Sequence, residues 1–146
     1  MSQKELQEKM IQYQALEETF KELNERRDIF TSKMMEIEQT KEAIDEVIKA
    51  KEDEVYIPLG SSVFLPGKLN KKEKMIVGIG ADAIMEKNVD EVKEILDQRK
   101  KMIEDGLEDV QNHMKDVVGK IRKIEPEIQK MYSQLQKSAE TEVQAG

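Results

Sequence analysis

Few residue types in this 146-residue sequence could carry out chemistry, and their usual partners are missing. Cys is absent, so there is no Cys nucleophile and no thiolate metal site. His113 is the only His, so no second imidazole can share a metal and no Ser/His/Asp arrangement can be argued. We expect His113 to be a solvated side chain beside a helix seam, and we expect neither a metal nor a cofactor.

Two short segments could bind anions, and each has a simpler interpretation. Gly78–Gly80 lacks the third glycine of a dinucleotide loop and the Gly-Lys-Ser/Thr of a P-loop, and no helix follows directly. A hairpin turn is the better interpretation. Lys71, Lys72 and Lys74 enclose Glu73 and are predicted to form an exposed turn. The many carboxylates suit helix faces and i,i+4 pairs, so nothing indicates an enzyme.

The composition is typical of long helices that share a narrow seam. Charged residues make up 38% of the chain, apolar residues 38%, and the net charge is −7. An ordinary domain carries about 25% charge. The acidic total argues against nucleic acid as a partner, and no stretch approaches the ~20 apolar residues that span a bilayer. With no apolar leader and no Cys, we expect a soluble cytoplasmic protein.

Residues 1–52 are predicted to form one long helix. No Gly or Pro interrupts residues 1–57, and Ser2 with Glu5 forms a capping-box pattern. Ten of fourteen heptad positions are apolar, which is typical of a coiled-coil seam. These positions are Leu6, Lys9, Tyr13, Leu16, Phe20, Leu23, Arg27, Phe30, Met34, Ile37, Lys41, Ile44, Ile48 and Lys51.

Residues 88–138 are predicted to form a second helix, with Asn88 as its N-cap and Glu91 as the reciprocal partner. Pro126 is expected to bend or break the helix on its outer face. Residues 139–146 are small and polar and are predicted to be a frayed tail. The seam of this helix is Ile103, Leu107, Val110, Met114, Val117, Ile121, Ile124, Ile128, Met131 and Leu135, with Val89 and Leu96 upstream.

The two helices are expected to pair as an antiparallel coiled-coil hairpin, because neither can bury its seam alone. If Glu52 lies near Asn88, the numbers of facing residues add to about 140, which places Tyr13 near Glu127. Both ends of the chain then meet at the far end of the helix pair. The residues expected there, called the tip residues below, are Leu6, Met10, Tyr13, Met131, Tyr132 and Leu135. They either close the seam or form an adaptable apolar surface for partners.

Residues 53–87 switch to period two and are predicted to form four short strands in two hairpins. The segment holds four of the seven Gly and has no net charge, whereas residues 1–52 carry −4 and residues 88–146 carry −3. Hairpins of this size are marginal alone, and no helix is left to cover them. We therefore expect their apolar face to be buried against strands of other subunits.

The central block resembles the alpha-type subunits of the prefoldin family, archaeal alpha subunits and related eukaryotic ones. The resemblance rests on VYIPLGSSVFLPGKL at residues 55–69 and MIVGIGADAIMEK at residues 75–87, between two long helices. It covers essentially the whole chain. Two hairpins between the helices also distinguish alpha-type from beta-type subunits, which have one.

The resemblance implies an α+β fold in which the double hairpin joins an intersubunit β-barrel. It implies a hexamer of two alpha and four beta subunits, which captures unfolded clients at the tips without ATP and passes them to a group II chaperonin. Carried onto this chain, the tip residues would bind clients. Assembly would use Val55, Ile57, Leu59, Val63, Leu65, Val77 and Ile79. The alternative is a scaffold or filament-forming relative of the same architecture, without general chaperone activity.

Overall fold

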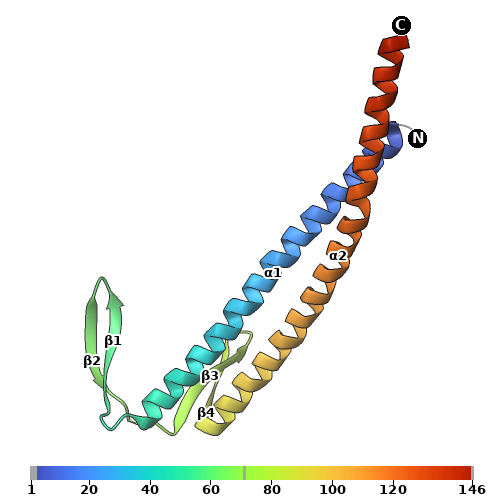
Figure 1. The fold of residues 1–146 in the computed structure, drawn as a ribbon. Helices are drawn as coiled ribbons and strands as arrows, with labels where there is room; N and C mark the ends of the chain where they lie inside the picture. Colours follow the sequence, from blue (N-terminus) through green and yellow to red (C-terminus); the bar gives the residue numbers. More distant parts are fainter. Residues whose placement is uncertain (1–2, 71, 146) are drawn as a thin grey trace. The chain divides into compact units, whose positions relative to one another are not determined.

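The structure is a computed structural model that describes residues 3–70 and 72–145. In chain order its elements are α1 (Gln3–Lys49), β1 (Glu54–Gly60), β2 (Val63–Lys68), β3 (Lys74–Gly80), β4 (Ala83–Asn88) and α2 (Val89–Ala145) (Figure 1). This order confirms the predicted fold class of two long helices with two small antiparallel hairpins between them. The chain forms two compact units. The helical unit comprises the chain up to Thr31 and from Asp105 onward, and the hairpin unit comprises Ser32–Glu104.

In the helical unit, α1 and α2 pack along the predicted seam. Every seam position from Leu6 to Phe30, and from Leu107 to Leu135, is buried or half-buried. The core consists of Leu23, Val110, Met114 and Val117, with Leu16, Phe20, Phe30 and Ile121 packed against it. An ion pair joins Lys9 to Glu127. The helices of this unit are therefore antiparallel, within a few residues of the predicted pairing of Tyr13 with Glu127.

The second helix differs from its prediction in two places. α2 continues without a break through Pro126, so the expected break is wrong. Pro126 and Arg122, whose carbonyl loses its helical donor, are both exposed, so water can take the donor's place. α2 also continues to Ala145 instead of fraying after residue 138. The side chains of residues 136–144 are all exposed, and good helix formers such as Ala139 and Glu140 favour the helix there.

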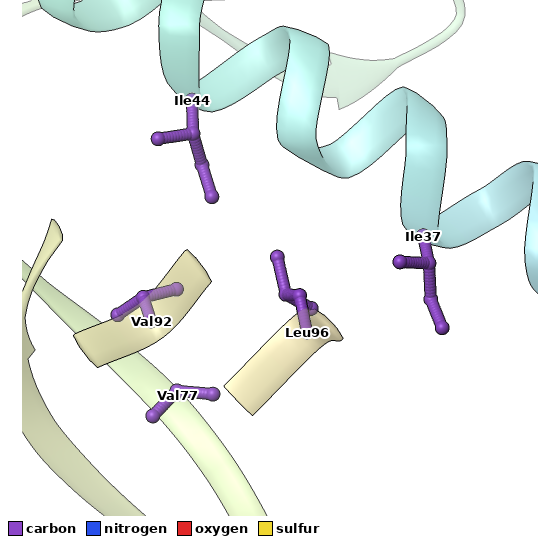
Figure 2. Close-up of a cluster of buried hydrophobic side chains, with 5 residues drawn as sticks. All are labelled: Ile37, Ile44, Val77, Val92 and Leu96. Atoms are coloured by element: carbon purple, nitrogen blue, oxygen red, sulfur yellow. The ribbon is translucent and has the colours of Figure 1, made fainter. Parts of the chain in front are cut away.

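The core of the hairpin unit joins one hairpin to both helices. Figure 2 shows Val77 of β3 beside Val92 and Leu96 of α2, with Ile37 and Ile44 of α1 opposite. All five side chains are buried. This corrects the expectation that no helix covers the hairpins: the β3–β4 hairpin lies on the helix pair. Beyond Ile44 the predicted seam of α1 ends, since Ile48 and Lys51 are exposed.

Three ion pairs set the helix register in this unit. Lys100 Nζ lies 2.8 Å from Glu38 Oε1, Lys41 Nζ lies 2.6 Å from Asp97 Oδ1, and Lys93 Nζ lies 2.6 Å from Asp45 Oδ1. In each pair the two residue numbers add to 138, close to the predicted 140. The predicted cap is confirmed at the start of α2, where the Glu91 amide donates to Asn88 Oδ1 at 2.8 Å. Ser2, of the cap predicted for α1, lies outside the described residues.

Both hairpins turn through two residues with positive φ. These are Ser61 and Ser62 (φ 48° and 63°) between β1 and β2, and Ala81 and Asp82 (φ 48° and 60°) between β3 and β4. Two central residues in this conformation make type I′ turns, which match the twist of paired strands. Gly78–Gly80 form the end of β3. The turn that was predicted there lies one residue further on, at Ala81 and Asp82.

The lysine cluster before β3 is not simply an exposed turn. Lys72 is half-buried, and its Nζ donates to the carbonyl of Ala50 at 2.7 Å and pairs with Asp53 Oδ1 at 3.0 Å. It thus ties the link between the hairpins to the end of α1. Lys71 lies outside the described residues.

Candidate functional site

The tip residues fall into two groups. Leu6 is 8% exposed, and Tyr13, Met131 and Leu135 are half-buried at seam positions. These four side chains close the seam, which is the plainer of the two interpretations considered for them. Met10 and Tyr132 lie off the seam and are 46% and 56% exposed. Of the six tip residues, these two are the exposed ones that could contact a partner.

A further exposed residue near the start of α1 was missed by the sequence analysis. Ile11 is 65% exposed, more than Met10 beside it. An isoleucine side chain that stays in water costs free energy. An apolar residue outside the heptad is therefore unusual, and this is the signal by which Ile11 could have been identified. Val143 near the end of α2 is 80% exposed and was missed for the same reason. The exposed apolar surface is therefore larger than predicted.

A hollow on one side of the seam contains two of the tip residues. Met10 and Tyr13 line it with Ile128, and the carboxylates of Glu17 and Glu125 lie at its rim. The hydrogen bond to Glu17, then desolvation and the charges of Glu17 and Glu125, raise the pKa of Tyr13 above its ordinary value. Both effects of the carboxylates favour the protonated phenol of Tyr13.

A second hollow, called the lysine groove below, lies on the other side of the seam. Its volume is about 450 Å³, and its lining includes Lys9, Leu16, Lys120, Lys123, Ile124 and Glu127. Leu16 and Ile124 are seam residues, half-buried and 7% exposed. Lys9 and Leu16 occupy seam positions on one side of α1, and Met10 and Glu17, one residue further on in each case, lie outside the seam on its other side. The lining of this groove thus carries lysines, whereas the lining of the first hollow carries the carboxylates of Glu17 and Glu125.

The β1–β2 hairpin is apolar on both faces. Residues opposite one another across a pair of strands share a face, so the register places Ile57 with Leu65 on one face and Tyr56 with Pro66 on the other. Ile57 and Leu65 are 47% and 51% exposed, and Tyr56 is 72% exposed. Five of the residues predicted for assembly lie in this hairpin. They are Val55, which is half-buried, and Ile57, Leu59, Val63 and Leu65, which are exposed.

In the β3–β4 hairpin, the predicted face is turned to the chain's own helices. Val77 is 8% exposed in the hairpin-unit core, so it holds this hairpin on the helices and is not free for another subunit. The preceding residue, Ile76, lies with Ile84 on the opposite face by the strand register. They are 70% and 67% exposed and were missed. Ile79, at the bulge before the turn, is 48% exposed.

One arginine fixes the β3–β4 hairpin from its edge. The Arg99 guanidinium of α2 donates to the backbone carbonyl of Gly78. A strand edge with free carbonyls and amides can pair with another chain, and this contact occupies one acceptor of β3. Apolar packing at Val77 and a polar contact at Gly78 therefore hold the same strand.

The described residues offer no site for metal chemistry. Among residues 3–70 and 72–145, no three His, Asp or Glu side chains gather closely enough to hold a metal ion. His113 is exposed there. In that part of the chain, no helix is long and apolar enough to cross a membrane.

Comparison with known proteins gives a consistent result. The family model for prefoldin subunits matches residues 12–134. Prefoldin subunit alpha of Nitrosopumilus maritimus is 30% identical over 98 residues, which cover 67% of this chain and 68% of that protein. The alpha subunit of Pyrococcus horikoshii is 26% identical over 97 residues, 65% of this chain and 66% of that protein. These matches thus span about two thirds of each relative's length.

A solved structure matches the fold over a larger part of the chain. The cryo-EM structure of filamentous PFD from Methanocaldococcus jannaschii superposes with a TM-score of 0.70. It covers 79% of this chain and 96% of the other, at 16% sequence identity. At this identity the match concerns the fold alone.

Proposed function

The chain belongs to the prefoldin family as an alpha-type subunit, and we propose that it is part of an ATP-independent chaperone that captures unfolded polypeptides. The observation that carries this proposal is the exposed apolar group of Met10, Ile11 and Tyr132 in the helical unit. A flexible thioether and an aromatic ring can adapt to many apolar segments. The tip residues buried in the seam would hold this surface in place. No step of the proposal requires catalysis.

The proposed assembly is a hexamer of two alpha-type and four beta-type subunits. Its supporting observation is the β1–β2 hairpin, whose two faces expose Tyr56, Ile57, Phe64 and Leu65. A two-stranded hairpin with so much exposed apolar surface is marginal alone. Pairing with the hairpins of other subunits into a β-barrel would bury both its faces and its edges. In the second hairpin, Ile76 and Ile84 take the place of Val77 in this proposal.

The client path that we propose ends at a second chaperone. Unfolded proteins held at the tip residues would pass to a group II chaperonin in the cytoplasm, where folding is completed. Binding without nucleotide hydrolysis suits such a transfer, since a holding site must release its client readily. Apolar side chains on a helix surface provide this kind of weak, multiple contact.

The test is suppression of aggregation by the assembled complex. The full chain is co-expressed with a beta-type subunit, and light scattering follows a model protein diluted from denaturant. We expect the complex to slow aggregation without ATP. A complex in which the alpha chain begins after residue 16 and ends before residue 128 should keep its mass but lose this activity. Unchanged aggregation with the full-length complex would overturn the proposal.

A scaffold or filament-forming subunit is the second candidate function. The filamentous assembly of the Methanocaldococcus jannaschii protein favours it, because that protein has the same fold. Mass measurement separates the two candidates. A closed hexamer that contains a beta-type subunit supports the chaperone, and an open-ended polymer of this chain alone supports the scaffold.

A further inference from the structure

The lysine groove differs in charge from the helix pair as a whole. Residues 1–52 and 88–146 carry net charges of −4 and −3, so most of the surface of α1 and α2 repels an acidic polypeptide. Within the groove, Lys9 is neutralised by Glu127. Lys120 and Lys123 line the groove and make no ion pair among the described residues, so they leave two positive charges in it.

The floor of the groove is apolar. Leu16 and the 7%-exposed Ile124 line it together with the lysine side chains. A volume of about 450 Å³ is enough for one or two side chains, since pockets for small ligands measure roughly 300–1,000 Å³. An apolar side chain can therefore rest on this floor while neighbouring carboxylates reach the lysines.

We propose that the lysine groove binds segments of unfolded clients in which apolar residues alternate with Asp or Glu. The inference rests on the proposed function and adds a class of client to it. Apolar surface alone would hold neutral segments, but acidic segments would meet the repulsion of the −7 chain. In the lysine groove, the positive charges of Lys120 and Lys123 offset that repulsion.

The hollow on the other side of the seam should not bind acidic segments. There Glu17 and Glu125 border the hollow that contains Tyr13, and neither carboxylate forms an ion pair with a cation in the part of the chain that the structure describes. An acidic segment is repelled on that flank and attracted on the flank of Lys120 and Lys123. We therefore expect acidic clients to lie on one side of the helix pair only.

Three labelled peptides of identical apolar content test the proposal, with Glu, Gln or Lys at every polar position. Their dissociation constants are measured by fluorescence anisotropy with the full chain, co-expressed with a beta-type subunit. Lys120→Gln/Lys123→Gln should weaken binding of the Glu peptide about fivefold and that of the Gln peptide less than about twofold. Lys101→Gln/Lys115→Gln, which removes two exposed lysines outside the groove, is the matched control. Lys120→Glu/Lys123→Glu should reverse the preference toward the Lys peptide.

The outcomes separate this inference from the proposed function. If the Gln peptide binds but the groove variant leaves the Glu peptide unchanged, the inference alone is wrong. Equal weakening by the control variant would also overturn it, because net charge and not the groove would then explain the effect. If none of the three peptides binds, both the inference and the chaperone proposal fail. Raised salt should reduce the loss caused by the groove variant, since exposed charges are screened.

Discussion

The ring of Phe30 lies where a side chain on Gly106 would begin. A Cβ at Gly106 would be 3.1 Å from Phe30 Cζ, closer than ordinary van der Waals contact, so the glycine lets an aromatic ring pack directly on the backbone of α2. Phe30 in turn packs against the core of the helical unit. A glycine in a helix interior destabilises the helix by about 1 kcal/mol relative to alanine. At Gly106 the missing side chain makes room for the Phe30 ring.

The first prediction compares two glycines of α2. Gly119→Ala should raise the free energy of unfolding by about 0.5–1 kcal/mol, because nothing outside its own stretch of helix backbone lies within 4 Å of its Cβ position. Gly106→Ala should gain less or destabilise the chain, because the Phe30 ring must move. Urea unfolding followed by circular dichroism measures both values. If Gly106→Ala stabilises as much as Gly119→Ala, the contact with Phe30 does not constrain the site.

The second prediction concerns adjacent residues of β3. Val77→Ala should lower the free energy of unfolding by about 1–3 kcal/mol, because it removes two methyl groups from the core of the hairpin unit (Figure 2). Ile76→Ala removes more atoms but from a side chain that is 70% exposed, so it should cost the isolated chain much less. In the proposed assembly, Ile76→Ala should instead weaken association, measured by mass at falling concentration. A larger stability loss at Ile76 would contradict the observed face assignment.

The different surroundings of Ile76 and Val77 show how far the sequence could predict the fold. The heptad located the seam residues up to Ile44, because a seam needs apolar side chains at a fixed spacing. The strands gave no such guide, since both faces are apolar: Met75 and Val77 on one, Ile76 and Ile84 on the other. Which face meets the helices depends on tertiary packing. Period two alone therefore could not predict that Val77, and not Ile76, meets the helices.

The antiparallel pairing of the helices predicted which residues are the tip residues. It could not predict how exposed each of them is. An antiparallel register fixes which residues lie near the ends, but it does not say which of them the seam buries. Leu6 is buried, whereas Met10, four residues further along, is 46% exposed. Ile11 also lies outside the heptad and is 65% exposed, but it was not among the predicted tip residues. Counting apolar residues outside the heptad would have found it.

The third prediction concerns acid. Hydrogen bonds and charge from Lys100 lower the pKa of Glu38, and those from Lys93 lower the pKa of Asp45. A carboxylate whose pKa is lower in the folded state stabilises the fold above its unfolded pKa, and this stabilisation is lost as the pH falls through the lowered value. The free energy of unfolding should therefore decline as the pH falls below about 4.

Glu38→Gln/Asp45→Asn should flatten this decline between neutral and acid pH. Glu36→Gln/Glu94→Gln is the control, since neither of these exposed carboxylates makes an ion pair among the described residues. Urea unfolding at a series of pH values provides the measurement. Profiles of the wild type and the ion-pair variant that superimpose would show that these pairs contribute nothing to the acid dependence.

The fourth prediction uses the turn of the first hairpin. Ser61 and Ser62 both have positive φ, a conformation that Asn and Gly adopt at lower cost. Ser61→Asn/Ser62→Gly should therefore stabilise the hairpin by about 0.5–1 kcal/mol. Ser61→Val should destabilise it, because a β-branched side chain is strained at positive φ. Amide hydrogen exchange in β1 and β2 follows both changes, and equal protection in the two variants would contradict the turn assignment.

The fifth prediction separates exposed apolar residues by their place in the chain. Met10→Ser/Ile11→Ser/Tyr132→Ser should abolish most of the suppression of aggregation while leaving helix content unchanged, because surface substitutions alter stability little. Ile29→Ser/Met35→Ser/Met102→Ser removes three side chains of similar exposure, 54%, 59% and 73%, and should retain the activity. Light scattering at matched complex concentration compares the two variants. If both variants lose activity equally, clients bind to exposed apolar residues in general, and Met10, Ile11 and Tyr132 do not form a dedicated site.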